Sequence, residues 1–243
     1  MEALLTAPGI LSLATLTFLE IVLGIDNIIF ISLVSNDLKE SQKPMARRLG
    51  LALALGFRIL MLLGITWLIG LTAPLFYLGD HAVSGRDAIL FAGGLFLLAK
   101  SSSEIFKKTE GRSHGDHERQ PKSLVGVIIQ IGLLDIVFSF DSVLTAIGMT
   151  DELVIMIVAV VISMIIMLTF AKPIANFIEK YVSLQILALS FLIMIGTVLV
   201  AESAHVEIPK PYVYSSVGFA LIVQLLSIRA AEKSKSTGSG PQV

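Results

Sequence analysis

Long apolar runs follow one another along most of the chain and are separated by short polar segments. A run of about 20 apolar residues is long enough to cross the hydrocarbon core of a bilayer as a helix. The pattern therefore predicts an all-α membrane protein with seven membrane-spanning helices. The predicted spans are Ile10–Val34, Ala46–Leu71, Asp87–Phe106, Leu124–Gly148, Leu153–Ala171, Leu184–Ala201 and Tyr212–Ile228.

The composition excludes several classes of protein. Hydrophobic residues make up 55% of the 243 residues and charged residues only 15%, whereas soluble domains are about 25% charged. The net charge of −1 gives no basis for nucleic-acid binding, and the absence of cysteine excludes thiolate metal ligands and disulfides within the chain. The segment Met1–Gly9 lacks the basic region of a cleaved signal peptide, so the first apolar run is expected to remain as a span.

The basic residues predict the orientation in the membrane. Of the 18 Lys and Arg residues, only Arg86 and Lys210 fall in segments on the same side as the N-terminus, while Arg58 and Lys100 lie inside predicted spans. Cytoplasmic loops of membrane proteins carry an excess of Lys and Arg. We therefore expect an N-terminus outside and a cytoplasmic C-terminus, in a plasma membrane of the bacterial type.

One short pattern occurs twice, as Glu20–Asn27 and as Asp135–Ser142, at an offset of 115 residues. Each copy has an acidic residue, Ile-Val, two variable positions, an apolar residue, Asp and a small polar residue. A repeat unit of three helices is odd-numbered, so the second unit should be inverted in the membrane, which is a common plan in transporters. The predicted organisation is a first repeat at 1–106, a cytoplasmic linker at 107–123, a second repeat at 124–203, a seventh helix at 204–230 and a flexible tail at 231–243.

The repeated pattern places four carboxylates inside apolar helices, at Glu20, Asp26, Asp135 and Asp141. A carboxylate at the centre of a bilayer costs about 2.5–3.5 kcal/mol on insertion scales. These groups should therefore face the protein interior or a cavity. A structural hydrogen-bonded pair is the simpler alternative, but ionisable residues within a membrane usually mark ion or proton pathways.

Helical spacing arranges the polar residues of each copy as one stripe, with Glu20, Gly24 and Asn27 in the first copy and Asp135, Ser139 and Ser142 in the second. Carboxylate, amide and hydroxyl oxygens are hard ligands that suit Mn²⁺, Mg²⁺ or Ca²⁺. Softer candidates within the spans are methionines, which we interpret as core residues, namely Met164, Met167 and Met194. The sequence thus predicts a transporter that carries a divalent cation as its transported ligand and has no prosthetic group. Crowded carboxylates cannot all stay ionised without a cation, which favours proton exchange.

Other charged residues have less specific interpretations. Arg58 lies at the centre of the second predicted span, where it should act as a counter-ion to the acids or as a gate that a metal displaces. Lys100 and Glu104 have the spacing of an ion pair at the cytoplasmic end of the third span, or could line a vestibule. His114 and His117 form a weak metal-binding pattern in the predicted linker, where a solvated role is more common.

At the two motif copies, at Arg58 and in the segment 202–214, the sequence resembles the TerC family of integral membrane proteins, over roughly residues 8–230. The resemblance implies a seven-helix fold related to the lysine-exporter superfamily, with metal transport, chiefly manganese export, as the activity. It implies a metal site at the motif positions, formed by Asp26, Asn27, Asp141 and Ser142 with Glu20 and Asp135 close by.

Three other functions are compatible with the sequence. Two buried aspartates on separate helices could serve an intramembrane aspartyl protease, although the GxGD signature of that class is absent and Leu23–Asp26 matches it in part. An exporter of basic amino acids and a non-transporting scaffold are the remaining alternatives. We favour a transporter, not an enzyme, whose partners are the lipid bilayer and a divalent metal ion, without nucleic acid; an oligomer is also compatible with the sequence.

Overall fold

The computed structural model of the chain describes residues 6–36, 38–79, 81–110, 123–150, 152–206 and 208–236. Within these ranges it gives the backbone but not the side chain of a small set of residues. They are Leu23, Ile25, Asp26, Leu78, His81, Glu110, Asp141, Thr145, Lys210 and residues 234–236.

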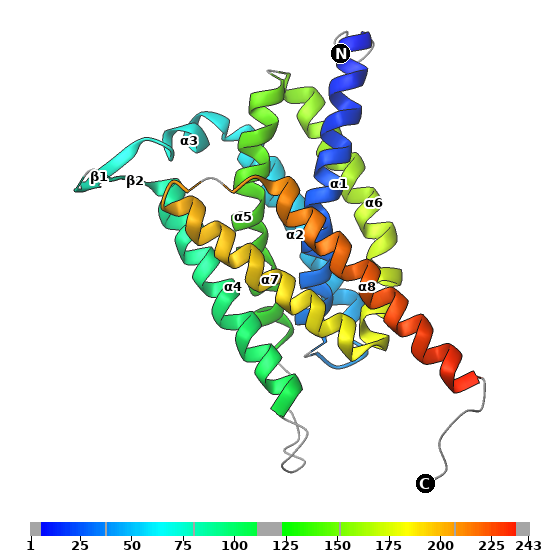
Figure 1. The fold of residues 1–243 in the computed structure, drawn as a ribbon. Coiled ribbons are helices and arrows are strands. Elements are labelled where there is room, and N and C mark those ends of the chain that lie inside the picture. The colour runs from blue at the N-terminus through cyan, green and yellow to red at the C-terminus, as the bar shows by residue number, and fades with distance from the viewer. Residues whose placement is uncertain are drawn as a thin grey trace.

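Long helices form nearly all of the described part, and they run up and down beside one another (Figure 1). Two short strands interrupt the helices near the outer end expected from the charge pattern. In chain order the elements are α1 (Ala7–Ser35), α2 (Lys43–Leu63), α3 (Ile65–Gly70), β1 (Pro74–Leu78), β2 (His81–Ser84), α4 (Gly85–Glu110), α5 (Leu124–Met149), α6 (Leu153–Lys180), α7 (Val182–Ser203) and α8 (Lys210–Ser236).

Six of the described helices are long and apolar enough to cross a membrane, namely α1, α4, α5, α6, α7 and α8. The prediction of an all-α membrane protein is therefore confirmed, whereas the count of seven spans is not. The predicted span Ala46–Leu71 is divided at Gly64 into α2 and the short helix α3. Helix α2 differs from these six helices in charge, because it carries three arginines, Arg47, Arg48 and Arg58, whereas the apolar segment of each candidate span contains at most two charged residues.

The long helices pack in three principal pairs: α1 lies along α6, α2 along α5, and α4 along α7. Helix α8 lies against the outside of α7, as Figure 1 shows. The α4–α7 crossing depends on two glycines. A Cβ atom at Gly94 would lie 2.7 Å from the carbonyl oxygen of Gly196, and a Cβ at Gly196 would lie 2.9 Å from that of Gly94. The two backbones can approach so closely because neither residue has a side chain.

The segment between α3 and α4 forms an antiparallel β-hairpin, which the sequence analysis did not predict. Its register pairs Phe76 with Val83 and Tyr77 with Ala82. The turn contains Gly79 at φ +65°, a left-handed conformation that favours glycine. The hairpin projects away from the helices (Figure 1) and leaves the side chains of Phe76 and Tyr77 exposed.

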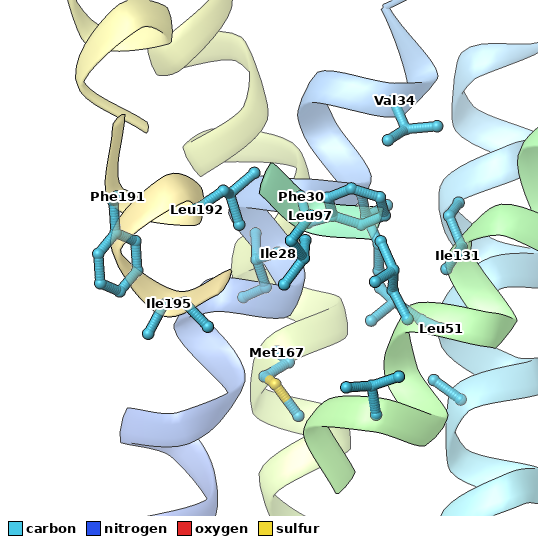
Figure 2. Packing of buried hydrophobic residues seen from close by; sticks show 14 of the residues in the cluster. Ile28, Phe30, Val34, Leu51, Leu97, Ile131, Met167, Phe191, Leu192 and Ile195 are labelled. Atoms are coloured by element: carbon cyan, nitrogen blue, oxygen red, sulfur yellow. The ribbon is translucent and has the colours of Figure 1, made fainter. Parts of the chain in front are cut away.

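Two apolar clusters fill the interior between the helices. One includes Leu16, Phe140 and Val160, and the other includes Ile28 and Ile131. Figure 2 shows the second cluster, in which side chains from several helices, including Ile28 of α1 and Leu51 of α2, surround a common centre. Along α1 the first cluster precedes Glu20 and the second follows Asn27. Along α1 the polar stripe therefore lies between an apolar layer around Leu16 and Phe140 and an apolar layer around Ile28 and Ile131, and the second cluster also continues between α4 and α7 as far as Leu90 and Leu199.

Candidate functional site

A buried ion pair joins the middle of α1 to the C-terminal half of α2. The guanidinium Nη1 of Arg58 donates a hydrogen bond to Oε2 of Glu20. Each of the two residues is 1% exposed. The pairing places the positive charge of α2 directly against the first acidic residue of the repeated motif. Burial at this level requires such pairing, because an isolated ion would lose its hydration without compensation.

The same guanidinium also reaches α5. Nε and Nη2 of Arg58 donate hydrogen bonds of 3.1 and 2.9 Å to Oγ of Ser139. Oγ of Ser139 in turn donates to Oδ2 of Asp135 at 3.1 Å, and Nη2 of Arg58 lies 3.9 Å from Oδ1 of Asp135. Ser139 is fully buried and Asp135 is 3% exposed. Arg58 therefore links the acidic residues of both motif copies.

The small polar residue of each motif copy faces the acidic residue of the other copy. Nδ2 of Asn27 donates a hydrogen bond of 2.9 Å to Oδ1 of Asp135. The Ser142 side chain lies near the Glu20 carboxylate, and its Oγ donates to the Ser139 carbonyl oxygen at 3.1 Å. These crossed contacts require α1 and α5 to run antiparallel, as Figure 1 shows. The resulting network covers about 10 Å of helix length, because each motif spans seven residues at 1.5 Å per residue.

The charges in this network do not balance. One guanidinium faces two carboxylates, so the described part of the network carries a charge of −1 when Glu20, Arg58 and Asp135 are all ionised. The side chains of Asp26 and Asp141 lie outside the described part of the structure, and their backbones belong to α1 and α5. Among the described side chains, no three His, Asp or Glu residues are close enough to hold a metal ion together.

The network thus brings together Glu20, Asn27, Asp135 and Ser142 with the central Arg58, all of which the sequence analysis singled out. The Lys100–Glu104 pair lies outside this network, in the C-terminal half of α4, and Nζ of Lys100 is 2.8 Å from Oε1 of Glu104. His114 and His117 lie outside the described residues.

Two further polar contacts were not predicted. Arg47, which is 8% exposed, donates from Nη2 to Glu179 and from Nε to Ser35 at 3.1 Å, so it connects α2 with α6 and α1. No local pattern in the sequence indicates this tertiary contact. Ser84 and Asp87 form a reciprocal cap at the start of α4, in which each backbone N–H donates to the side chain of the other residue. Here a Ser-x-x-Asp pattern before an apolar run is a recognisable signal.

Comparisons with known proteins agree with this architecture. The model of the integral membrane protein TerC family matches residues 5–238. The "UPF0053 protein" of Haemophilus influenzae is 50% identical over 220 residues, which cover 90% of this chain and 93% of the relative. The "UPF0053 inner membrane protein YgdQ" of Escherichia coli (strain K12) is 49% identical over 218 residues, with 90% and 92% coverage.

A longer relative also matches. The "UPF0053 inner membrane protein YoaE" of Escherichia coli (strain K12) is 45% identical over 216 residues, which cover 88% of this chain but 42% of YoaE. No solved structure matches the chain. The family match covers nearly all of the chain, and it coincides with a bundle of potential membrane-spanning helices. The chain therefore belongs to the TerC family of integral membrane proteins.

Proposed function

We propose that this protein is a membrane transporter that exports a divalent metal cation, with Mn²⁺ as the preferred substrate, and that it is not an enzyme. The observation that carries the proposal is the buried network in which Arg58 joins Glu20 of α1 to Asp135 of α5. Ionisable groups at this depth are costly, and in membrane proteins they generally mark ion or proton pathways. An excess of carboxylates over the guanidinium favours a cationic substrate.

The helix contacts support an inverted repeat of α1–α2–α4 and α5–α6–α7. In this repeat α1 corresponds to α5, α2 to α6 and α4 to α7. Exchange of the two units therefore converts the α1–α6 pair into the α5–α2 pair and leaves the α4–α7 pair unchanged. These are the three principal packing pairs. The same exchange relates the Asn27–Asp135 hydrogen bond to the proximity of Ser142 and Glu20. The reciprocal contact of Gly94 with Gly196 also has this symmetry. Transporters built from inverted repeats place their substrate site at the interface between the units, near the midplane.

Helix α2 is the seventh span in this proposal, and it is the counterpart of α6. Its charged residue at mid-height, Arg58, is fully compensated inside the bundle and does not face lipid. Basic residues at its start then lie on the cytoplasmic side, in agreement with the positive-inside rule. The N-terminus is outside and the C-terminus is in the cytoplasm.

The two apolar layers support alternating access. The outer layer includes Leu16 and Phe140, and the inner layer includes Ile28 and Ile131. A hydrated cation cannot cross such layers without a rearrangement, because an apolar environment cannot replace the water around an ion. We infer that opening of one layer at a time admits the cation to the network from one side. Arg58 must then leave at least one carboxylate when the cation binds, and proton uptake by Glu20 or Asp135 would reset the charge.

The chemistry of the substrate follows from the ligands. Asp26, Asn27, Asp141 and Ser142, together with Glu20 and Asp135, supply oxygen atoms, which suit Mn²⁺, Mg²⁺ and Ca²⁺. Manganese as the metal, export as the direction and the relation to the lysine-exporter superfamily come from the resemblance to the TerC family, and they are parts of the same proposal.

Metal binding by the purified protein tests this function. We expect Mn²⁺ to bind to the wild type with a measurable Kd in isothermal titration, and Asp26→Asn and Asp141→Asn each to weaken binding. Glu152→Gln is the matched control, because it neutralises an exposed carboxylate at the start of α6. Equal Mn²⁺ affinity in the wild type and in both aspartate variants would refute the site.

A further inference from the structure

Met167 of α6 lies directly against the polar stripe of α1. A Cβ atom at Gly24 would lie 2.1 Å from Sδ of Met167 and 3.0 Å from its Cε, so the thioether occupies the space that any other residue at position 24 would fill. Gly24 stands on the stripe between Glu20 and Asn27, one turn from each. The sulfur atom is therefore at the level of the buried network, and Met167 is only 2% exposed.

This contact has a counterpart in the other half of the molecule. The residue that corresponds to Gly24 in the second motif copy is Ser139, and Arg58 of α2 contacts Ser139 as Met167 of α6 contacts Gly24. The inverted repeat thus has a guanidinium at one of two corresponding positions and a thioether at the other. The two halves of the site are chemically different. Arg58 compensates the carboxylates of Glu20 and Asp135, and a sulfur atom adjoins the half that contains Gly24 and Asn27.

Packing explains why an apolar residue lies at position 167, but it does not distinguish Met from Leu. Met164, one turn earlier in α6, is equally buried and belongs to the same apolar cluster. Figure 2 shows Met167, with its sulfur atom in yellow, among the other side chains of this cluster. What distinguishes Met167 is that its sulfur, a polarisable donor with lone pairs, adjoins a residue without a side chain on the polar stripe.

We propose that Met167 is a specificity-determining residue, and that its thioether adds one soft ligand to the oxygen ligands of the proposed metal site. The inference rests on the proposed function and extends it to the class of substrate. Thioether sulfur favours transition and soft metals, whereas Mg²⁺ and Ca²⁺ select oxygen ligands. The site should therefore discriminate in favour of the softer Cd²⁺ and against Mg²⁺ and Ca²⁺, while Mn²⁺ is held mainly by the oxygen ligands.

The test compares the binding of Cd²⁺, Mn²⁺ and Mg²⁺ to the wild type, Met167→Leu and the control Met164→Leu. Loss of an outer-shell partner already lowers metal affinity about 10- to 100-fold, so Met167→Leu should lower the affinity for Cd²⁺ by at least about tenfold. The affinity for Mg²⁺ should change little, and Met164→Leu should match the wild type. An unchanged ratio of Cd²⁺ to Mg²⁺ affinity in Met167→Leu would overturn the inference and leave the proposed function intact.

X-ray absorption of the Cd²⁺-loaded wild type gives a second, independent measurement that needs no variant. The chain contains no cysteine, so any sulfur atom bound to Cd²⁺ must come from methionine. We expect a Cd–S contribution in the wild type, and its absence would also overturn the inference. A wild type that binds none of the three metals would refute the proposed function together with this inference.

Discussion

Asn27 of α1 donates a hydrogen bond of 2.9 Å to Asp135 of α5, and these two residues belong to opposite ends of one repeated motif. Asn27 is the last position of the first copy, and Asp135 is the first position of the second. The contact therefore joins the two halves of the chain in antiparallel orientation. It also satisfies one oxygen atom of a carboxylate that is almost completely buried.

Asn27→Ala should destabilise the protein, because Asp135 loses a buried hydrogen bond. A hydrogen bond to a charged group contributes about 1.5–3 kcal/mol, so the midpoint of thermal unfolding in detergent should fall by several degrees. Ser190→Ala is the control, since Ser190 is exposed and its hydroxyl donates to its own helix. Equal midpoints for the two variants would contradict the importance of the Asn27 contact.

Arg58 and Glu20 should show strong energetic coupling. Removal of one partner of a buried ion pair costs about 3–5 kcal/mol when the other charge is left uncompensated, as Arg58→Gln leaves Glu20 and Asp135, whereas Glu20→Gln leaves Arg58 beside Asp135 and should cost less. Arg58→Gln and Glu20→Gln should each lower the free energy of unfolding, and the double variant should lose clearly less than the sum of the two. Arg48→Gln combined with Glu20→Gln provides the control, because Arg48 is exposed. Additive effects in the Arg58–Glu20 cycle would show that the two side chains do not interact.

Gly24→Ala should displace the Met167 thioether from the polar stripe. The new methyl group would lie 2.1 Å from Sδ, and the flexible side chain of Met167 can turn away at a cost of about 1–3 kcal/mol. The variant should therefore bind Cd²⁺ as weakly as Met167→Leu does, while its affinity for Mg²⁺ changes little. At Gly56 in α2 a Cβ atom meets no other atom within 4 Å, so Gly56→Ala should retain wild-type selectivity. Wild-type Cd²⁺ affinity in Gly24→Ala would contradict the position of the sulfur.

Gly94→Ala should force α4 and α7 apart. Its Cβ atom would lie 2.7 Å from a backbone oxygen of Gly196, and a helix backbone cannot rotate away as a side chain does. We expect a loss of about 1–3 kcal/mol or more in the free energy of unfolding. Gly148→Ala, at an open position near the end of α5, should be neutral. A Gly94→Ala variant that is as stable as Gly148→Ala would be inconsistent with this helix crossing.

Cysteine labelling should determine whether α2 crosses the membrane. The natural chain contains no cysteine, so Lys39→Cys, before α2, and Thr72→Cys, after α3, each carry a single thiol. Both positions are exposed in the structure. A membrane-impermeant maleimide added to intact cells should label Thr72→Cys and should reach Lys39→Cys only after permeabilisation. Labelling of both thiols from the same side would exclude α2 as a span. Labelling of Lys39→Cys in intact cells, with Thr72→Cys labelled only after permeabilisation, would show that the orientation is the reverse of the proposed one.

Much of the helical architecture follows from the sequence because length and hydropathy determine which segments can cross a bilayer. The break at Gly64 was missed since the apolar run continues without interruption as far as Leu71. The hairpin has a recognisable signal, Gly79 and Asp80 between two short runs that contain aromatic and β-branched residues, and it lies in the connection between the second and third predicted spans. Hydropathy does not report such short local turns.

The site was predictable at the level of helix faces but not of contacts. The stripe of Glu20, Gly24 and Asn27 follows from helical spacing, and the repeat indicates the corresponding stripe on α5. The meeting of Met167 with Gly24 depends on how α6 packs against α1, which no local pattern contains. For this reason the sequence alone predicts a core residue at Met167, and the proposed role in metal selectivity depends on the packing of α6 against α1.

The most direct test of the central claim is Mn²⁺ flux across proteoliposomes that contain the wild type or the double variant Glu20→Gln, Asp135→Asn. This variant neutralises the two carboxylates that Arg58 joins. We predict saturable Mn²⁺ flux in the wild type that responds to an imposed pH gradient, and no flux above empty liposomes in the variant. A folded double variant that transports Mn²⁺ at the wild-type rate would contradict the account.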